Sequence, residues 1–310
     1  MFDFVGKAPR FILLSLAVIV CGMVFLAVLG FPLGIDFTGG TMTMVEFEGY
    51  VHPDELRQKL EDLGHHDVVI QGVEPVVGES SFLIRTRELA EGEEQRIMKA
   101  FEGLGSIGKP SSEFIAGTIA RERARGAAIA VVVAAIGILL YISWAFRKLP
   151  NPFRYGTCAI IALAHDVLIV VAVFAILGRL LHLEINLMFI TAILAVIGYS
   201  VNDTIVVFDR IRENLGKEAH QSFETVVNNS LTETLSRSLN TSLTTLIALA
   251  AIYLFVGEAI RSFVFVLMVG VVAGTYSSIF IAAQALVAWE TGKMGGIPQF
   301  IRNFKMQRAN

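Results

Sequence analysis

Long uninterrupted apolar runs dominate the pattern of hydrophobic and polar positions along this chain. A transmembrane helix needs roughly 20 mostly apolar residues to cross the hydrocarbon core of a bilayer. The runs that meet this requirement are residues 11–33, 126–146, 155–178, 185–208, 238–257 and 262–289. The pattern therefore predicts an α-helical polytopic membrane protein with six transmembrane helices.

The first apolar run raises the question of a signal peptide, because it follows Lys7 and Arg10. It is longer than a signal-peptide core of about 7–15 residues, and no A-x-A-like cleavage site ends it. We expect a permanent helix.

Lysine and arginine in the short connections indicate the orientation of the chain. The connections after the second and fourth spans, the N-terminus and the C-terminal tail are rich in Lys and Arg, whereas the opposite side has only Arg179 and Arg261 in its short turns. We expect both termini in the cytoplasm and the segment 34–125 outside it.

Segment 34–125 alternates patterns typical of strands and helices. The expected order is strand 41–47, helix 53–63, strands 68–76 and 81–86 joined around residues 77–79, helix 91–101 and strand 112–115. This β-α-β-β-α-β order predicts a small α+β ferredoxin-like domain between the first two helices.

The predicted domain organisation follows from these elements. It comprises 1–33 as cytoplasmic N-terminus and first helix, 34–125 as the extracytoplasmic domain, 126–290 as the bundle of five further helices, and 291–310 as a cytoplasmic tail. Within the bundle, the period of apolar residues predicts an amphipathic cytoplasmic segment at 210–237.

Composition agrees with this class of protein. The chain of 310 residues is 54% hydrophobic and 17% charged, against about 25% charged for a soluble domain. A net charge of -3 argues against binding of nucleic acid. Cys21 and Cys158 lie in apolar runs and are interpreted as small hydrophobic residues. We expect no metal site, since the histidines of the α+β domain have no neighbouring cysteine, and no cofactor.

Ionisable residues inside a span are costly and therefore candidates for function. Asp203 lies in the fourth apolar run. Arg237 opens the fifth run, which is expected to be antiparallel to the fourth and to begin on the cytoplasmic side, where the fourth ends. Burial favours the neutral form of a carboxyl and a nearby guanidinium favours the charged form, so the pair could act as a titratable switch. Two interpretations stay open here: a switch that binds a proton or sodium ion, and a static buried pair. Polar residues that would line such a site are Ser200, Asn202, Thr204, Asn240, Thr241, Ser242, Thr244 and Thr245.

His165 and Asp166 form a second polar pair in the third apolar run. We expect a role in helix packing or proton relay rather than a metal site. Gly270, Gly274 and Ser278 place small residues at four-residue spacing, which permits close approach of helices.

Several motifs in order resemble the SecF members of the SecD/SecF family, which belongs to the RND superfamily. The sequence GIDFTGGT at 34–41 resembles the motif after the first span, with Asp36, Gly39 and Gly40 as its characteristic residues. ALAHDV at 162–167, IGYSVNDT at 197–204 continuing through FDRIREN at 208–214, and TLSRS at 234–238 with TSLTT at 241–245 resemble the motifs of the third to fifth spans. Ser238 stands where threonine is expected, and YSSIF at 276–280 fits the last span.

The resemblance implies a function beyond what the residues alone indicate. Such proteins join SecD in a SecDF complex in the prokaryotic plasma (inner) membrane. The complex is thought to associate with the SecYEG channel, with YajC as a further candidate partner, and to act on translocating preprotein in the lipid bilayer, driven by proton or sodium flow. By the motif match, Asp203 and Arg237 are the ion-coupling residues.

Three alternatives belong to other classes. Half of a small-molecule RND efflux transporter would normally carry a larger outer domain. A non-coupling scaffold of the Sec channel would not depend on Asp203. An enzyme is the least expected, because no nucleophile or metal shell accompanies the acid and base groups.

Overall fold

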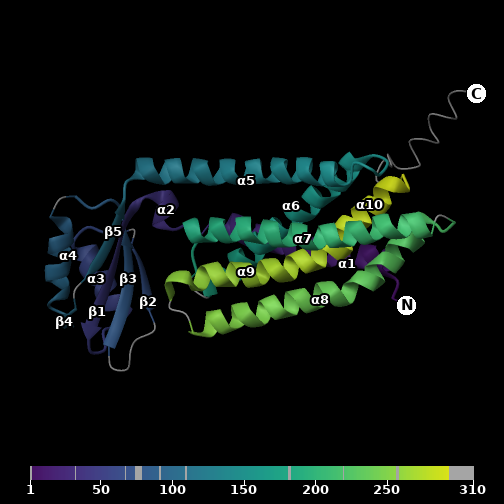
Figure 1. Cartoon of the computed structure of the whole chain (residues 1–310). Helices are drawn as coiled ribbons and strands as arrows, with labels where there is room; N and C mark the ends of the chain where they lie inside the picture. Colours follow the sequence, from purple (N-terminus) through teal and green to yellow (C-terminus); the bar gives the residue numbers. More distant parts are fainter. Residues whose placement is uncertain are drawn as a thin grey trace, which may run out of the picture. The chain divides into compact units, whose positions relative to one another are not determined.

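The computed structural model describes residues 2–31, 33–66, 68–73, 79–90, 92–108, 110–180, 183–218, 220–255 and 258–292. Six helical segments in these residues are long and apolar enough to cross a membrane. They are α1 (Phe4–Leu29), α5 (Gly117–Ala145), α6 (Pro152–Leu180), α7 (Leu187–Lys217), α8 (Phe223–Phe255) and the last span formed by α9 (Glu258–Ser277), the π-helix η1 (Ser278–Ala282) and α10 (Ala283–Glu290). The six predicted spans are confirmed, and most extend beyond the apolar run that indicated them (Figure 1).

The chain divides into a helical unit, containing residues 1–30, 131–177 and 191–310, and an α/β unit, containing residues 31–130 and 178–190. In the helical unit, α6, α7 and the last span form the interior. Their most hydrophobic windows are 44%, 50% and 61% buried, whereas those of α1, α5 and α8 are 17%, 6% and 11% buried. Two of these interior helices, α6 and α7, carry the buried aspartates Asp166 and Asp203.

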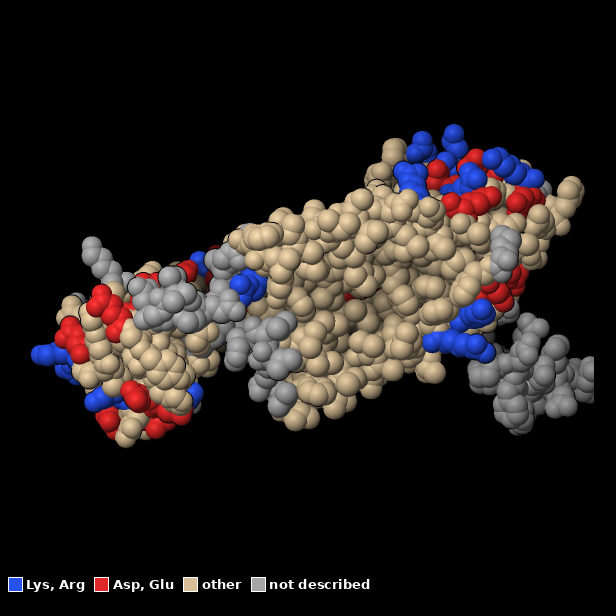
Figure 2. Space-filling view, turned by 90° about the horizontal axis from the view of Figure 1, so that it is seen from below, with Lys and Arg blue, Asp and Glu red and all other residues tan. Residues whose placement is uncertain are grey.

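The surface of the helical unit fits a bilayer. On the face seen in Figure 2, uncharged residues cover its middle, and most Lys, Arg, Asp and Glu side chains lie at its ends. A broad uncharged band between charged ends is expected of helices that span hydrocarbon, where charges are costly.

The α/β unit contains an antiparallel sheet with strand order β2-β3-β1-β4, in which β5 also pairs with β1. Its elements are α2 (Ile35–Thr38), β1 (Gly40–Glu48), α3 (Pro53–Asp62), β2 (Val69–Val73), β3 (Glu79–Thr86), α4 (Glu93–Phe101), β4 (Ser106–Ile107) and β5 (Ser111–Ile115). The order of strands and helices confirms the predicted ferredoxin-like domain, with its last strand divided into β4 and β5. The predicted turn at residues 77 and 78 lies outside the described residues.

Alternation along the central strands builds the core of this domain. Val45, Phe47, Phe82 and Ile84 point to one face of the sheet and pack with apolar residues of α3 and α4, which lie beside each other (Figure 1). Met42, from the other face of β1, packs with Ile35 of α2, Ile115 of β5 and Ala120 of α5. The sheet therefore has apolar contacts on both faces.

The structure divides the segment 210–237 differently from the sequence analysis. Residues up to Lys217 complete α7, and Phe223 begins α8, so the amphipathic stretch forms the ends of two long helices instead of a separate element. Its apolar side chains Val227 and Leu231 are fully buried. The residues of the predicted tail from 293 onward lie outside the described residues.

Candidate functional site

Two buried carboxyl groups lie inside the helical unit, and their surroundings differ. Asp166 of α6 is fully buried. Its Oδ2 accepts hydrogen bonds from Ser200 Oγ of α7 at 2.6 Å and from Ser277 Oγ of α9 at 2.8 Å, and its Oδ1 lies 3.1 Å from His165 Nδ1. Asp166 thus connects the three interior helices, which supports the packing role expected for it.

His165 lies beside Asp166 and is 8% exposed. Its ring stacks on Tyr276 with the ring centroids 6.0 Å apart and an interplanar angle of 16°, and the Tyr276 hydroxyl donates to Phe11 O at 2.6 Å. His165 Nε2 is buried and has no hydrogen-bond partner among the described residues. His165 therefore extends the polar network from α6 toward α1 and α9.

Asp203 of α7 is the second buried carboxyl, and it is 8% exposed. Ser238 Oγ of α8 donates to its Oδ1 at 2.6 Å. Its Oδ2 is buried without a well-formed hydrogen bond to any described residue. The Ser278 hydroxyl also interacts with this carboxyl, but its well-formed bonds are with Thr204 Oγ1 at 3.0 Å and Gly274 O at 2.9 Å. One oxygen of Asp203, Oδ2, consequently lies near the Ser278 hydroxyl without a well-formed hydrogen bond.

A further set of hydroxyls continues this polar region between α7, α8 and α9. Tyr199 donates to Ser242 Oγ at 3.1 Å, and Ser242 hydrogen-bonds Thr275. The sequence analysis had named Ser200, Thr204 and Ser242, and the structure brings all three into this region. The hydrogen bonds of Ser238, Thr275 and Ser277 are not predicted from the sequence, although hydroxyl residues in apolar spans are a visible signal.

Arg237 and the rest of the predicted lining of α8 lie elsewhere. Arg237 is exposed and forms no ion pair with Asp203 in the described structure. Asn202 of α7 is also exposed. The α8 residues Asn240, Thr241 and Thr244 are exposed and Thr245 is half-buried, and the threonine hydroxyls donate to backbone carbonyls of their own helix. The ion-coupling roles of Asp203 and Arg237 stay predictions.

Small residues allow α9 to approach α7 at the level of these carboxyls. A Cβ atom added to Gly270 would lie 2.0 Å from Val196 Cγ2, and one added to Gly274 would lie 2.8 Å from Ser200 Cβ. The predicted close approach is therefore present, and it positions Ser200 beside Asp166.

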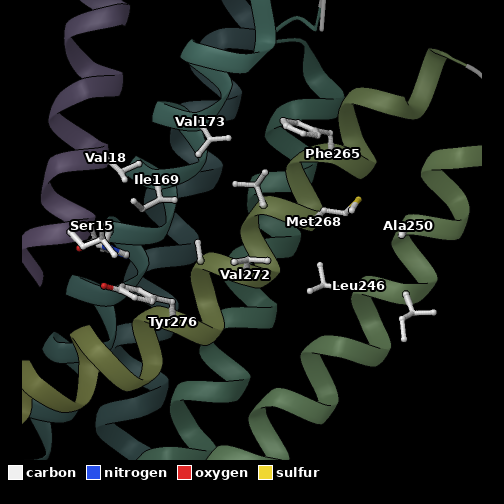
Figure 3. Close-up of a pocket in the computed structure, with 15 residues that line it drawn as sticks. Ser15, Val18, Ile169, Val173, Leu246, Ala250, Phe265, Met268, Val272 and Tyr276 are labelled. Carbon is white, nitrogen blue, oxygen red and sulfur yellow. The ribbon is translucent and has the colours of Figure 1, made fainter. Parts of the chain in front are cut away.

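A cavity of about 730 Å³ lies among α1, α6, α8 and α9. Figure 3 shows apolar side chains around it, including Val18, Ile169 and Phe265, with Ser15 and Tyr276 near each other at one end. Of the described residues that line it, Ser15, His165 and Tyr276 alone have polar side chains. Such a lining does not solvate an ion, so the carboxyl groups remain the candidates for ion binding.

In the α/β unit, the predicted motif after the first span has a defined structure. Asp36 Oδ1 accepts from Arg123 Nη1 of α5 at 2.5 Å, and its Oδ2 accepts from Leu187 N of α7 at 3.0 Å. Gly39 and Gly40 have φ of 73° and 123°, and a Cβ on Gly40 would lie 2.5 Å from Thr86 O. These two glycines allow the chain to turn from α2 into β1.

No metal centre accompanies these groups. Among the residues that the structure describes, no cluster of three or more His, Cys, Asp or Glu side chains is arranged to hold a metal ion.

Family models match two parts of the chain. Residues 96–292 match the model described as "Protein export membrane protein SecD/SecF, C-terminal", and residues 24–49 match "SecD/SecF GG Motif". The second match contains Asp36, Gly39 and Gly40.

Curated relatives and solved structures agree with these matches. The chain is 43% identical to "Protein translocase subunit SecF" of Thermobaculum terrenum, with 94% of each protein covered, and 40% identical to the protein of that name from Anaerolinea thermophila, with 94% and 96% covered. It is 36% identical to "Protein translocase subunit SecDF" of Thermus thermophilus, where it covers 38% of the longer protein. A crystal structure of SecDF from Thermus thermophilus, described as "a translocon-associated membrane protein", superposes with a TM-score of 0.81 at 35% identity, over 94% of this chain and 39% of that one. By sequence and by fold, the chain belongs to the SecD/SecF family of protein-export membrane proteins.

Proposed function

We propose that this chain acts in protein export as a SecF-type subunit, and that it uses a proton or sodium gradient through Asp203. The names of its relatives support the export role, and the chain covers nearly the full length of the SecF proteins that it matches. Both termini lie in the cytoplasm in this proposal, and the α/β unit faces preprotein on the opposite side of the plasma membrane.

The observation that carries the proposal is the incomplete bonding of Asp203. The residue lies inside the apolar run 185–208 of α7, six residues before Asp209, which follows that run. A buried carboxyl with one unused oxygen is costly in a low dielectric, and a proton or cation relieves that cost. Ion binding there changes the charge between α7, α8 and α9, and thereby the preferred packing of these helices.

The polar face of α8 supports a protein partner within the membrane. Arg237, Asn240, Thr241 and Thr244 follow one another at helical spacing and are exposed in the isolated chain. A charged and polar stripe is unfavourable against lipid, whereas polar groups of another helix can satisfy it. Relatives named SecDF continue well beyond the length of this chain. We propose SecD as the partner that covers this stripe, and association of the pair with SecYEG and YajC.

The decisive experiment is gradient-driven translocation of a preprotein into vesicles that contain this chain, SecD and SecYEG. Asp203→Asn should abolish the gradient-dependent stimulation and leave the ATP-driven translocation intact. The matched control is Asp209→Asn, which neutralises an exposed carboxylate on the same helix, paired with Arg212. Comparing proton and sodium gradients identifies the coupling ion.

Unchanged stimulation with Asp203→Asn, in a protein that is inserted and bound to SecD, would reject ion coupling at this residue. A scaffold role would then be the better account. Export of a small hydrophobic compound by the purified pair, without an effect on preprotein, would instead favour the efflux alternative.

A further inference from the structure

A largely buried ion pair joins the sheet of the α/β unit to the connection between α6 and α7. Arg85 of β3 contacts Glu184, and their side chains are 12% and 17% exposed. Arg85 lies on the face of the sheet opposite Phe82 and Ile84, because successive residues of a strand point to opposite faces. The connection is therefore held on the face that α3 and α4 do not cover.

Backbone bonds hold the same connection to the segment that follows α1. Gly34 N donates to Ile185 O at 2.9 Å, and Leu33 forms a parallel bridge with Ile185. Gly34 also has little room, since a Cβ there would lie 3.2 Å from Glu184 Oε2 and 3.4 Å from Asn186 Cβ. The two segments thus pack closely over several residues.

Asp36 completes the arrangement at the first turn of α7. Its carboxyl group binds Leu187 N and Arg123 at the same time. The first backbone N–H groups of a helix lack partners within the helix, and a carboxylate there is stabilised by the helix dipole. Asn186 Oδ1 accepts from Phe189 N at 3.0 Å and caps the same turn. The N-terminus of α7 is therefore bonded by a group that belongs to the α/β unit.

We call Asp36, Arg85, Arg123 and Glu184 the α7 anchor. Burial lowers the pKa of Arg85 to about 10, which still leaves the guanidinium charged at neutral pH. Arg85 Nε has no partner among the described residues, so Glu184 is the carboxylate that compensates this buried charge. Loss of Glu184 would leave a cation without a counter-ion and would release the connection.

α7 links the α7 anchor to the buried carboxyl of the helical unit. It runs without a break from Leu187 to Lys217, and its first four residues belong to the α/β unit. Asp203 lies 16 residues after Leu187, about 24 Å along the helix at 1.5 Å per residue. A hydrogen-bonded helix of this length moves largely as a rigid element.

We propose that the residues of the α7 anchor are positioning residues, which fix the first turn of α7 to the α/β unit so that a change at Asp203 reaches the sheet through α7. This inference rests on the proposed ion coupling at Asp203. It assigns to the motif around Asp36 a mechanical role between the membrane helix and the domain. The alternative is a static support that stabilises the fold without transmitting anything.

Hydrogen exchange of the full chain with SecD in lipid nanodiscs distinguishes these roles. Exchange is followed in peptides from Glu79–Thr86 and from residues 33–40. Asp203→Asn should change exchange in these peptides several-fold, because the anchored sheet responds to the state of α7. The same substitution combined with Glu184→Gln should lose that response, whereas Glu94→Gln, an exposed acid on α4, should retain it.

A charge exchange controls for general damage to the fold. Arg85→Glu with Glu184→Arg restores the opposite charges and should restore the response to Asp203→Asn, which a variant that is only misfolded would not do. The α7 anchor is rejected if Asp203→Asn leaves the sheet unaffected, if the response survives Glu184→Gln, or if the exchanged pair fails to restore it.

Translocation measured on the same variants separates this inference from the proposed function. If Asp203→Asn leaves translocation unchanged but alters exchange through Glu184, ion coupling fails and the α7 anchor holds. If translocation needs Asp203 but the sheet does not respond, the proposed function holds and the α7 anchor fails.

Discussion

Replacing each of the two buried carboxyl groups by an amide should affect the stability of the helical unit to different extents. Asp166→Asn and Asp203→Asn each replace a carboxyl by an amide in the interior of the helical unit. Asp166 has three partners on three different residues, whereas Asp203 has one well-formed bond, from Ser238. We expect Asp166→Asn to lower the stability of the bundle and Asp203→Asn to leave it nearly unchanged.

The size of the effect follows from the bonds lost. An amide placed with Nδ2 at Oδ2 of Asp166 no longer accepts from Ser200 and Ser277. The Ser277 hydroxyl can turn to Gly274 O, at 3.2 Å, whereas the Ser200 hydroxyl bonds no other acceptor among the described residues. With Nδ2 at Oδ1 instead, the contact with His165 is lost in the tautomer that carries the proton on Nδ1, because two N–H groups then face each other. Hydrogen bonds to charged groups contribute about 1.5–3 kcal/mol, and neutral ones between membrane helices about 0.6 kcal/mol. Asp166→Asn should therefore cost about 2–4 kcal/mol.

For Asp203, the amide oxygen can keep the bond from Ser238, and Nδ2 takes the place of an atom without a well-formed bond. The expected cost is below about 1 kcal/mol, since the one well-formed bond of this side chain is kept.

The chain contains a reporter for this measurement. Cys158 lies on α6, eight residues before Asp166, and is fully buried, whereas Cys21 is exposed. In a Cys21→Ser background, a dye that reacts with free thiols therefore reports thermal unfolding around α6 in detergent. One kcal/mol shifts Tm by about 2–4 °C in chains of 150–250 residues. Asp166→Asn should lower Tm by at least about 4 °C, and Asp203→Asn by less than about 4 °C.

Equal losses of Tm for the two variants would show that Asp203 is as fully bonded as Asp166, and would remove the structural reason for assigning ion binding to Asp203. An unchanged Tm for Asp166→Asn would contradict its role in joining α6, α7 and α9.

Three further predictions concern packing and backbone geometry. Gly270→Ala should lower Tm, because its new Cβ meets Val196 and overpacking costs about 1–3 kcal/mol. Adding Val196→Ala to this variant should partly restore Tm. The control Gly137→Ala should not lower Tm, since a Cβ there meets no neighbour within 4 Å. Phe101→Ala should cost about 3–5 kcal/mol of stability in the α/β unit, since Phe101 is fully buried and its ring centroid lies 6.2 Å from that of Phe47. Faster limited proteolysis of this unit in the full chain would confirm the loss, and an unchanged rate of proteolysis would contradict it. Asn151 has φ of 53°, so Asn151→Gly should retain the parent Tm while Asn151→Val lowers it. An unchanged Tm for Asn151→Val would show that the backbone of this turn relaxes.

The sequence by itself determined the class of protein and the order of its elements. Apolar runs of sufficient length indicate spanning helices whatever their neighbours, because the requirement is set by bilayer thickness. Alternation of apolar residues likewise determined the central strands of the ferredoxin-like domain, since β1, β2 and β3 each have one face on α3 and α4. The motifs identified the family, and the scarcity of charge inside the spans drew attention to Asp203 and Asp166.

Only the tertiary structure decided what these residues contact. Both aspartates appear alike in the sequence, but the rotation and approach of α7 and α9 bring two serines to Asp166 and leave one oxygen of Asp203 unused. The predicted hairpin of the fourth and fifth spans places Arg237 near Asp203. In the structure, the Arg237 side chain instead lies on the exposed face of α8. Asp36 and Leu187 are 151 residues apart and meet at the first turn of α7. A local pattern encodes the period of an element and its buried face, whereas partners of polar groups depend on how separate elements are rotated and packed against each other.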